Sequence, residues 1–229
     1  MKNQYFGDTR DLFKYDLVLR ILGCVPALRS FTFIPMLTAD DRSSDGSRTD
    51  HRRARAAGSQ NTSLVRYLEG CIRDGRRDIR EILPFFRDRG ITVHLHGEGF
   101  THQERAGYFR SIPDPWFRDA LVLLDPDVGL EVARPTGKHL LFAEIRDLLG
   151  RMTGSSVLMV FQYFPRVNRA AYLENRTGEL GKIIPGTPLV LSDNQVAFFF
   201  LVKELETGKV VQDILAGYRD DYPSLTLFQ

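Results

Sequence analysis

Residues 121–131 read Leu-Val-Leu-Leu-Asp-Pro-Asp-Val-Gly-Leu-Glu, an apolar run that leads directly into an acidic loop. An unbroken apolar run is typical of a central strand that is covered on both faces of a parallel sheet. Pro126 and Gly129 favour a turn immediately after it. The stretch therefore predicts a buried strand that ends at Leu124 and carries acids at its carboxyl end.

Predicted helices and strands alternate on both sides of this run. Further strands are predicted at residues 31–37, 91–96, 156–161, 189–191 and 196–202, and Pro35 is expected to end the first of them or to place it at a sheet edge. Helical spacing covers residues 11–22, 63–86 with a break at Gly75, 104–110, 139–152, 168–181 and 211–218. This order predicts a single α/β domain over residues 1–229. We expect it to be Rossmann-like, with a mostly parallel sheet and helices on both faces.

Residues 38–89 stand out as an arginine-rich loop followed by helices, and we interpret them as an insertion in that domain. A basic segment in a chain of net charge +2 favours a surface that faces nucleic acid. The alternative is an ordinary solvated loop and helix face. The arginines concerned are Arg42, Arg48, Arg52, Arg53, Arg55, Arg66, Arg73, Arg76, Arg77, Arg80, Arg87 and Arg89.

The composition limits the class of protein. With 229 residues, of which 43% are hydrophobic and 26% charged, the chain can bury a core without disulfide or metal staples. Cys24 and Cys71 show no metal-ligand spacing and are expected to be small core residues. The amino-terminal residues contain no apolar signal segment, and no run is long enough to span a membrane. A reducing, cytoplasmic setting is therefore expected.

The acidic loop is the first candidate site. Asp125, Asp127 and Glu131 crowd together at a predicted strand end, with Pro126 between the first two. Carboxylates that repel one another persist when a metal, a ligand amine or a lysine offsets their charge, and Lys138 is the nearest lysine. The structural alternative is a simple Asp-Pro turn.

Two more strand ends carry polar side chains, and ligands of open α/β sheets bind beyond the carboxyl ends of the strands. One end offers an amide, two aromatic rings and a guanidinium, which suit stacking on a base and binding of phosphate: Gln162, Tyr163, Phe164 and Arg166. The other end carries Thr38, Asp40 and Asp41, without the glycine-rich pattern of dinucleotide-binding loops. His94 and His96 alternate along one strand, which more often marks a polar face than a metal site.

The amino-terminal segment would line a pocket if it folded back over the sheet. It reads Asn3-Gln4-Tyr5-Phe6-Gly7-Asp8, and Lys14-Tyr15 follow in the first helix. Together with the Leu-Leu-Asp-Pro-Asp loop and the Phe-Gln-Tyr-Phe-Pro strand end, it resembles the J-type adenine methyltransferases of large-subunit (23S) ribosomal RNA and their relatives, the three-Cys-motif partner proteins. The likeness covers most of the chain in the order of its elements, with few identities.

The resemblance implies an S-adenosylmethionine-dependent methyltransferase fold acting on nucleic acid. Asp125 would then accept a hydrogen bond from the exocyclic amine of an adenine, beside Pro126, Asp127 and Glu131. Lys138 and the strand end that contains Tyr163 would bind the nucleic acid. Asp127 and Val128 stand where the family has a second proline and an aromatic ring. The resemblance would place Asp8, Lys14, Thr38, Asp40 and Asp41 at the cofactor.

Two other readings remain open. Asp125, Asp127 and Glu131 could bind Mg²⁺ or Mn²⁺, with Lys138 steadying negative charge, as in a metal-dependent nuclease or phosphohydrolase. Alternatively, the chain could be a non-catalytic module that binds nucleic acid or protein on a degenerate methyltransferase fold. The last reading would explain the altered acidic loop and the missing glycines after Leu37, but the methyltransferase-like enzyme ranks first.

Overall fold

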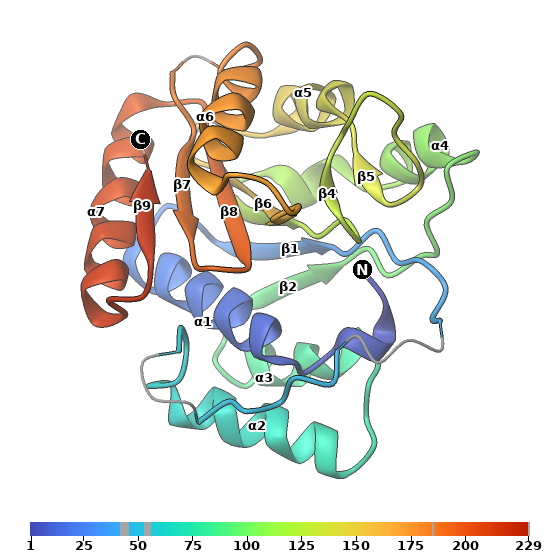
Figure 1. Ribbon diagram of the computed structural model, residues 1–229, viewed down its shortest axis with the longest axis vertical. Coiled ribbons are helices and arrows are strands. Elements are labelled where there is room, and N and C mark those ends of the chain that lie inside the picture. Colours follow the sequence, from blue (N-terminus) through green and yellow to red (C-terminus); the bar gives the residue numbers. More distant parts are fainter. Residues whose placement is uncertain (42–45, 53–55, 185, 229) are drawn as a thin grey trace.

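The computed structural model describes residues 1–41, 46–52, 56–184 and 186–228. Within these ranges a seven-stranded sheet forms the centre of the protein (Figure 1). Its strands are β1 (Ser30–Ile34), β2 (Thr92–Leu95), β3 (Ala120–Leu124), β6 (Val157–Tyr163), β7 (Leu189–Ser192), β8 (Val196–Val202) and β9 (Thr226–Phe228).

The sheet is mostly parallel, with an antiparallel side. Its order is β2-β1-β3-β6-β8-β7-β9. The first four of these strands run parallel to one another. β8 is antiparallel to both β6 and β7, and β9 is antiparallel to β7. The α/β class and the mostly parallel sheet are therefore confirmed, and the arrangement is compatible with a Rossmann-like fold.

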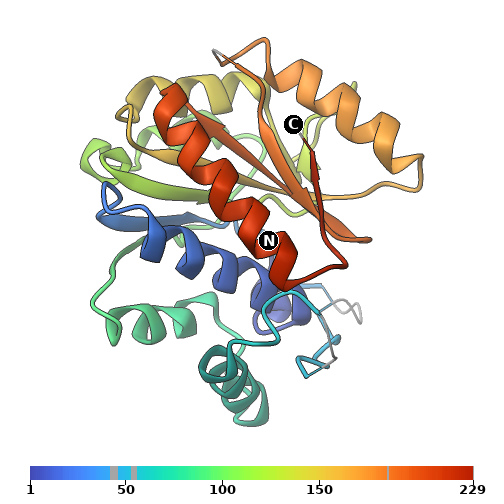
Figure 2. The same cartoon turned by 90° about the vertical axis from the view of Figure 1, so that its left-hand side faces the viewer.

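Helices cover both faces of the sheet, as Figure 1 shows. One apolar core is shared by the sheet with α1 (Thr9–Cys24), α2 (Thr62–Arg73), α3 (Ile82–Arg87) and α7 (Leu205–Asp221). The opposite core is shared with α4 (Arg105–Arg110), α5 (Phe142–Arg151) and α6 (Arg169–Leu180). Figure 2 shows α7 crossing the same face as α1, and the two helices are in contact.

Alternation along β3 explains why an unbroken apolar run is needed there. Leu121 and Leu123 enter the core with α1, whereas Val122 and Leu124 enter the core with α5. Successive side chains of a strand point to opposite faces, so a strand covered on both sides must be apolar at every position.

Smaller elements complete the fold. A separate two-stranded sheet, β4 (Gly129–Leu130) with β5 (His139–Leu140), follows β3. The single-turn helices are η1 (Asn3–Tyr5), η2 (Ile79–Glu81) and η3 (Asp114–Phe117). In the described part of the chain, no helix combines the length and the apolar character that crossing a membrane requires.

The strand in the apolar run 31–37 ends at Ile34, which is one of the two outcomes expected of Pro35, because proline has no N–H to donate to a neighbouring strand. One predicted boundary was wrong. The helix expected from residue 139 begins at Phe142, since the two residues of β5 pair with β4 instead. The break at Gly75 is confirmed: α2 ends at Arg73, and Gly75 has a φ of +70°.

The segment at residues 38–89 connects β1 to its parallel neighbour β2, so its helices form the crossover that this pairing requires. Arg42, Arg53 and Arg55 lie outside the described residues. Cys71 is buried in the core as expected, whereas Cys24, the last residue of α1, is exposed.

Candidate functional site

The candidate site lies at the carboxyl ends of β1 and β3. The chain leaves β1 toward β2 on one side and returns to form β3 on the other, so these neighbours flank the point where the strand order reverses. Open α/β sheets bind ligands in the crevice at such a point. The amino-terminal end of the chain lies close to the carboxyl ends of these two strands (Figure 1).

A small cavity marks the site. Its volume is about 20 Å³, which is room for about one water molecule. Carboxylates, two basic side chains and aromatic rings surround it. They come from the amino-terminal segment, from the first turns of α1 and from the ends of β3 and β6: Met1, Tyr5, Asp8, Arg10, Asp11, Lys14, Asp125, Pro126, Asp127, Phe161 and Tyr163.

Lys14 is the centre of a buried ion-pair trio. Its Nζ lies 2.5 Å from Asp125 Oδ2 and 2.7 Å from Asp11 Oδ1, and all three side chains are almost fully buried. Burial alone would lower the pKa of Lys14, but the two carboxylates raise it above its ordinary value. Burial raises the pKa of Asp125 and of Asp11. The trio contains one more carboxylate than ammonium.

Asp8 and Arg10 stand at the start of α1. The Asp8 carboxylate caps the helix by accepting hydrogen bonds from Arg10 N at 2.8 Å and Asp11 N at 3.0 Å. The Asp8 carboxylate also forms an ion pair with the Arg10 guanidinium, at 3.1 Å. That guanidinium lies over the Tyr163 ring, 4.7 Å from its centre. Asp8 therefore lines the cavity and fixes the helix that carries Lys14.

The loop after β1 is in contact with the amino-terminal segment. Thr38 N donates to Met1 O at 2.8 Å, Gln4 N donates to Asp40 Oδ1 at 3.2 Å, and Lys2 forms an ion pair with Asp41. The Met1 nitrogen donates to Pro35 O and Met36 O, which follow β1, and to Asp125 O, which follows β3. Three of the residues expected to bind a cofactor, Thr38, Asp40 and Asp41, are thus in contact with residues 1–4.

Asp127 differs from the other carboxylates. Its side chain is only 3% exposed, and its Oδ2 lies 3.5 Å from Lys138 Nζ, whose side chain is 52% exposed. Its other oxygen, Oδ1, is buried and accepts no hydrogen bond from any residue that the structure describes. A buried carboxylate oxygen without a donor is rare and calls for an explanation.

Glu131 has a separate task. Its Oε2 accepts a hydrogen bond from Phe142 N at 2.6 Å, at the first residue of α5. The three acids expected to share a metal therefore have three different partners: Lys14, Lys138 and a helix terminus. In the described ranges, no group of three or more His, Cys, Asp or Glu side chains is arranged to hold a metal ion.

The polar and aromatic side chains expected at the end of β6 also have different partners. Gln162 serves the main chain of the neighbouring segment: its Oε1 accepts from Leu130 N at 2.7 Å, and its Nε2 donates to Val128 O at 3.3 Å. Tyr163 lines the cavity, whereas Phe164 packs edge-on against Tyr172 of α6. Arg166 is exposed.

Four residues that line the cavity were not predicted from the sequence: Met1, Arg10, Asp11 and Phe161. Tyr5 belongs to the amino-terminal segment that was expected to line a pocket. One available signal was the spacing of Asp8, Asp11 and Lys14, because residues three apart share a helix face. Two acids and a lysine that share one face at the start of a helix indicate an ionic site.

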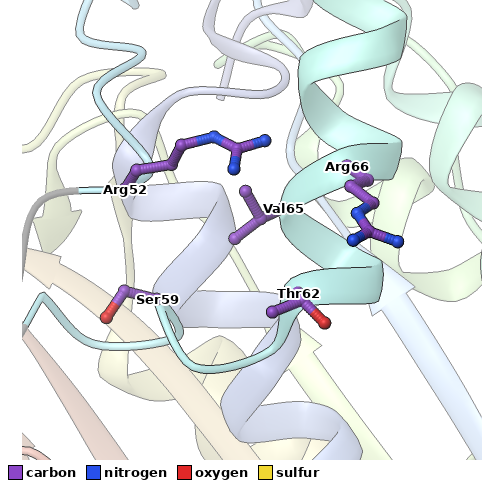
Figure 3. A pocket seen from close by; sticks show the side chains of 5 residues that line it. All are labelled: Arg52, Ser59, Thr62, Val65 and Arg66. Atoms are coloured by element: carbon purple, nitrogen blue, oxygen red, sulfur yellow. The ribbon is translucent and has the colours of Figure 1, made fainter.

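A second hollow lies in the arginine-rich segment, about 330 Å³ in volume, lined by Arg52, Ser59, Thr62, Val65 and Arg66 (Figure 3). The Arg52 guanidinium forms two hydrogen bonds with Glu69, at 2.8 and 2.6 Å. Other arginines pair within the segment: Arg73 with Asp74, Arg76 with Glu81 and Arg80 with Asp78. Internal carboxylates thus neutralise much of the segment's charge.

Compared with models of known protein families and with curated protein sequences, the chain matches none.

Proposed function

We propose that this protein is an S-adenosylmethionine-dependent methyltransferase-like protein whose acceptor is an amine of a nucleic-acid base. The observation that carries the proposal is the position of Asp125 and Pro126. They follow a central parallel strand directly and line a cavity at the strand-order reversal, together with Lys14 from the first helix. This is where an α/β sheet of this kind binds its ligands.

The chemistry of the cavity lining fits a cationic methyl donor. Acidic side chains outnumber the basic ones around it, and the rings of Tyr5, Phe161 and Tyr163 lie among them. Carboxylates and aromatic faces both attract a positive charge. When bound, S-adenosylmethionine supplies an electrophilic methyl group on a sulfonium. The residues of this chain would hold the acceptor amine in line with it, and positioning of that kind can provide much of a rate enhancement.

The volume of the cavity sets a condition on this proposal. A space of about 20 Å³ does not admit a nucleoside. The contacts that close the site join residues 1–4 to Thr38, Asp40 and Asp41. All of them are hydrogen bonds or ion pairs, and those of Gln4 with Asp40 and Asp41 are solvent-exposed, so the rupture of these exchanges protein partners for water. Binding therefore requires the amino-terminal segment to move away from the loop after β1.

The first test is calorimetric titration of the purified protein with S-adenosylmethionine. Micromolar affinity that is lost in Asp125→Ala supports the proposal. Asp125→Asn, checked for folding by circular dichroism, separates loss of binding from loss of structure. If the folded wild-type protein shows no affinity for S-adenosylmethionine, the proposal is wrong. A parallel titration with Mn²⁺ tests the metal-dependent alternative, for which heat that disappears in Asp125→Ala would be the expected result.

The second candidate is a non-catalytic module that binds nucleic acid, and the small size of the cavity favours it. The Arg52–Arg66 hollow would then be the functional surface. We expect such a module to bind single-stranded oligonucleotides with an affinity that falls steeply with salt. Arg66→Ala and Arg52→Ala would weaken that binding while Asp125→Asn leaves it unchanged. The opposite pattern favours the methyltransferase-like function.

A further inference from the structure

Two aspartates lie two positions apart at the end of β3, and the structure gives them different surroundings. We propose that Asp127, rather than Asp125, provides the carboxylate oxygen that accepts a hydrogen bond from the acceptor's amine. Asp125 has the separate task of tying Lys14 and α1 to the sheet. This inference rests on the proposed function, and it names the group of this site that recognises the base.

The state of Asp127 Oδ1 is the first observation. The side chain is 3% exposed, it borders the cavity, and Oδ1 has no donor among the described residues. Removing a charged oxygen from water without replacing its hydrogen bonds is unfavourable. A carboxylate with such an oxygen, in a residue that lines the cavity, is suited to a ligand that brings the missing donor, and the exocyclic amine of adenine has two N–H groups to offer.

The engagement of Asp125 is the second observation. Its Oδ2 lies 2.5 Å from Lys14 Nζ, inside a trio that is almost fully buried. The pair joins residues 111 positions apart in the sequence. If this oxygen turned to a ligand, the Lys14 ammonium would lose one of its two carboxylate partners while still buried. Asp125 Oδ2 is therefore committed to Lys14, whereas Asp127 Oδ1 is a buried acceptor without a donor among the described residues.

The position of Asp127 is fixed by its neighbours, which is the third observation. Immediately after it, Val128 N donates to Lys138 O at 3.0 Å, and Val128 O accepts from Tyr163 N at 3.1 Å. Lys138 approaches Oδ2 from the exposed side, at 3.5 Å. Two main-chain bonds of the next residue and a cation at one oxygen hold the carboxylate in place, so the oxygen without a donor is a preorganised acceptor.

The test compares two single-stranded oligonucleotides: one with adenine, and the same sequence with unsubstituted purine, which lacks the exocyclic amine. Their affinities are measured by fluorescence anisotropy in the presence of S-adenosylhomocysteine. We expect the wild-type protein to prefer adenine, and Asp127→Asn to lose most of a preference on the order of tenfold, the size that one hydrogen bond to a charged group provides. Asp220→Asn, a change at an exposed aspartate, should keep it.

Thermal melting of the ligand-free variants gives a readout that needs no substrate. Asp127→Asn removes a buried charge whose Oδ1 has no donor, and it gives up only the 3.5 Å pair with the half-exposed Lys138, so its melting temperature should equal or exceed that of the wild type. Asp125→Asn breaks the pair with Lys14, so it should melt at a lower temperature. A lower melting temperature for Asp127→Asn than for Asp125→Asn would overturn the division of tasks.

The outcomes separate this inference from the proposed function. If the wild type binds S-adenosylmethionine and prefers adenine, but Asp127→Asn keeps that preference while folded Asp125→Asn loses it, the inference is wrong and the proposed function stands. If the wild type neither binds S-adenosylmethionine nor distinguishes the two oligonucleotides, both are wrong. Loss of the preference in Asp127→Asn with unchanged affinity for S-adenosylmethionine supports both.

Discussion

Lys14 Nζ lies 2.5 Å from Asp125 Oδ2, although the two residues are 111 positions apart. The pair joins the second turn of the first helix to the end of the central strand β3. Both side chains are almost fully buried, so water provides little compensation if either partner is removed. This contact sets the relation between α1 and the sheet, and it determines which acid at the site remains available.

Lys14→Met should destabilise the protein strongly, because it leaves Asp11 and Asp125 buried without their cation. Breaking a buried pair by removing one partner costs about 3–5 kcal/mol. Urea denaturation measures the change. Lys209→Met is the control, since both side chains of its pair with Glu206 are exposed and its loss should change the stability little. The double variant Lys14→Met/Asp125→Asn should lose less than the sum of the single losses; additive losses would show that the pair is not coupled.

Gly129→Ala should destabilise the β4–β5 sheet and the loop that carries Asp127. Gly129 has a φ of +137°, and a Cβ there would lie 2.3 Å from the Gln162 side-chain amide. The backbone strain alone is worth about 1–3 kcal/mol. Gly137→Ala is the control, since its Cβ would come no closer than 3.4 Å to a neighbouring atom. Chemical denaturation should give a clearly lower free energy of unfolding for Gly129→Ala than for Gly137→Ala. Equal stabilities would contradict the close packing of Gly129 against Gln162.

Asp16 links three helical segments and should be a second sensitive position. Its Oδ2 accepts from the Tyr218 hydroxyl at 2.7 Å, and its Oδ1 accepts from Asn61 Nδ2 at 2.8 Å. Tyr218→Phe removes one of these bonds and should cost about 1 kcal/mol, whereas Asp16→Ala leaves several donors unpaired and should cost about 2–3 kcal/mol. Faster amide exchange at the start of α2 in Asp16→Ala would show that Asn61 has been released; unchanged exchange would argue against the link.

The stability of the protein should fall as the pH drops below neutrality, partly because of His96. Burial lowers the pKa of this imidazole below its ordinary value, so the unfolded chain binds a proton more readily than the folded one. Its contribution is therefore fully present above the ordinary value of about 6.5 and is lost as the pH falls through the folded pKa. Unfolding free energies measured between neutral pH and about pH 5 should fall less steeply in His96→Gln.

The comparison variant for that measurement is His94→Gln. Burial also lowers the pKa of His94. Its ring stacks on that of Trp116, with the two ring centres 4.9 Å apart. We expect each single variant to remove part of the slope and the double variant to remove more. A wild-type slope that persists unchanged in the double variant would assign the pH dependence to other groups.

The local features of the fold were predictable from the sequence because they depend on neighbouring residues. The apolar run before Asp125 predicted a strand covered on both faces, and β3 ends at Leu124 as expected. Gly75 predicted the interruption after α2, since glycine adopts a positive φ without a steric penalty. Asp125 and Pro126 were placed at the carboxyl end of a central strand for the same local reason.

Tertiary structure alone decided which groups are paired. Nothing in the pattern around Asp125 indicates that a lysine of the first helix reaches it, or that Glu131 serves the end of α5 instead of a shared site. The antiparallel entry of β8 beside β6 and the pairing of His139 with Gly129 also depend on long-range packing. Hydrophobic periodicity predicts which side chains of a helix or strand are buried. A side-chain hydrogen bond, in contrast, depends on the positions of segments that are far apart in the sequence. The sequence by itself therefore determined the layered α/β architecture and the edge at which the acids gather, whereas only the packed fold decided that Asp125 pairs with a buried lysine and that one oxygen of Asp127 has no donor among the described residues.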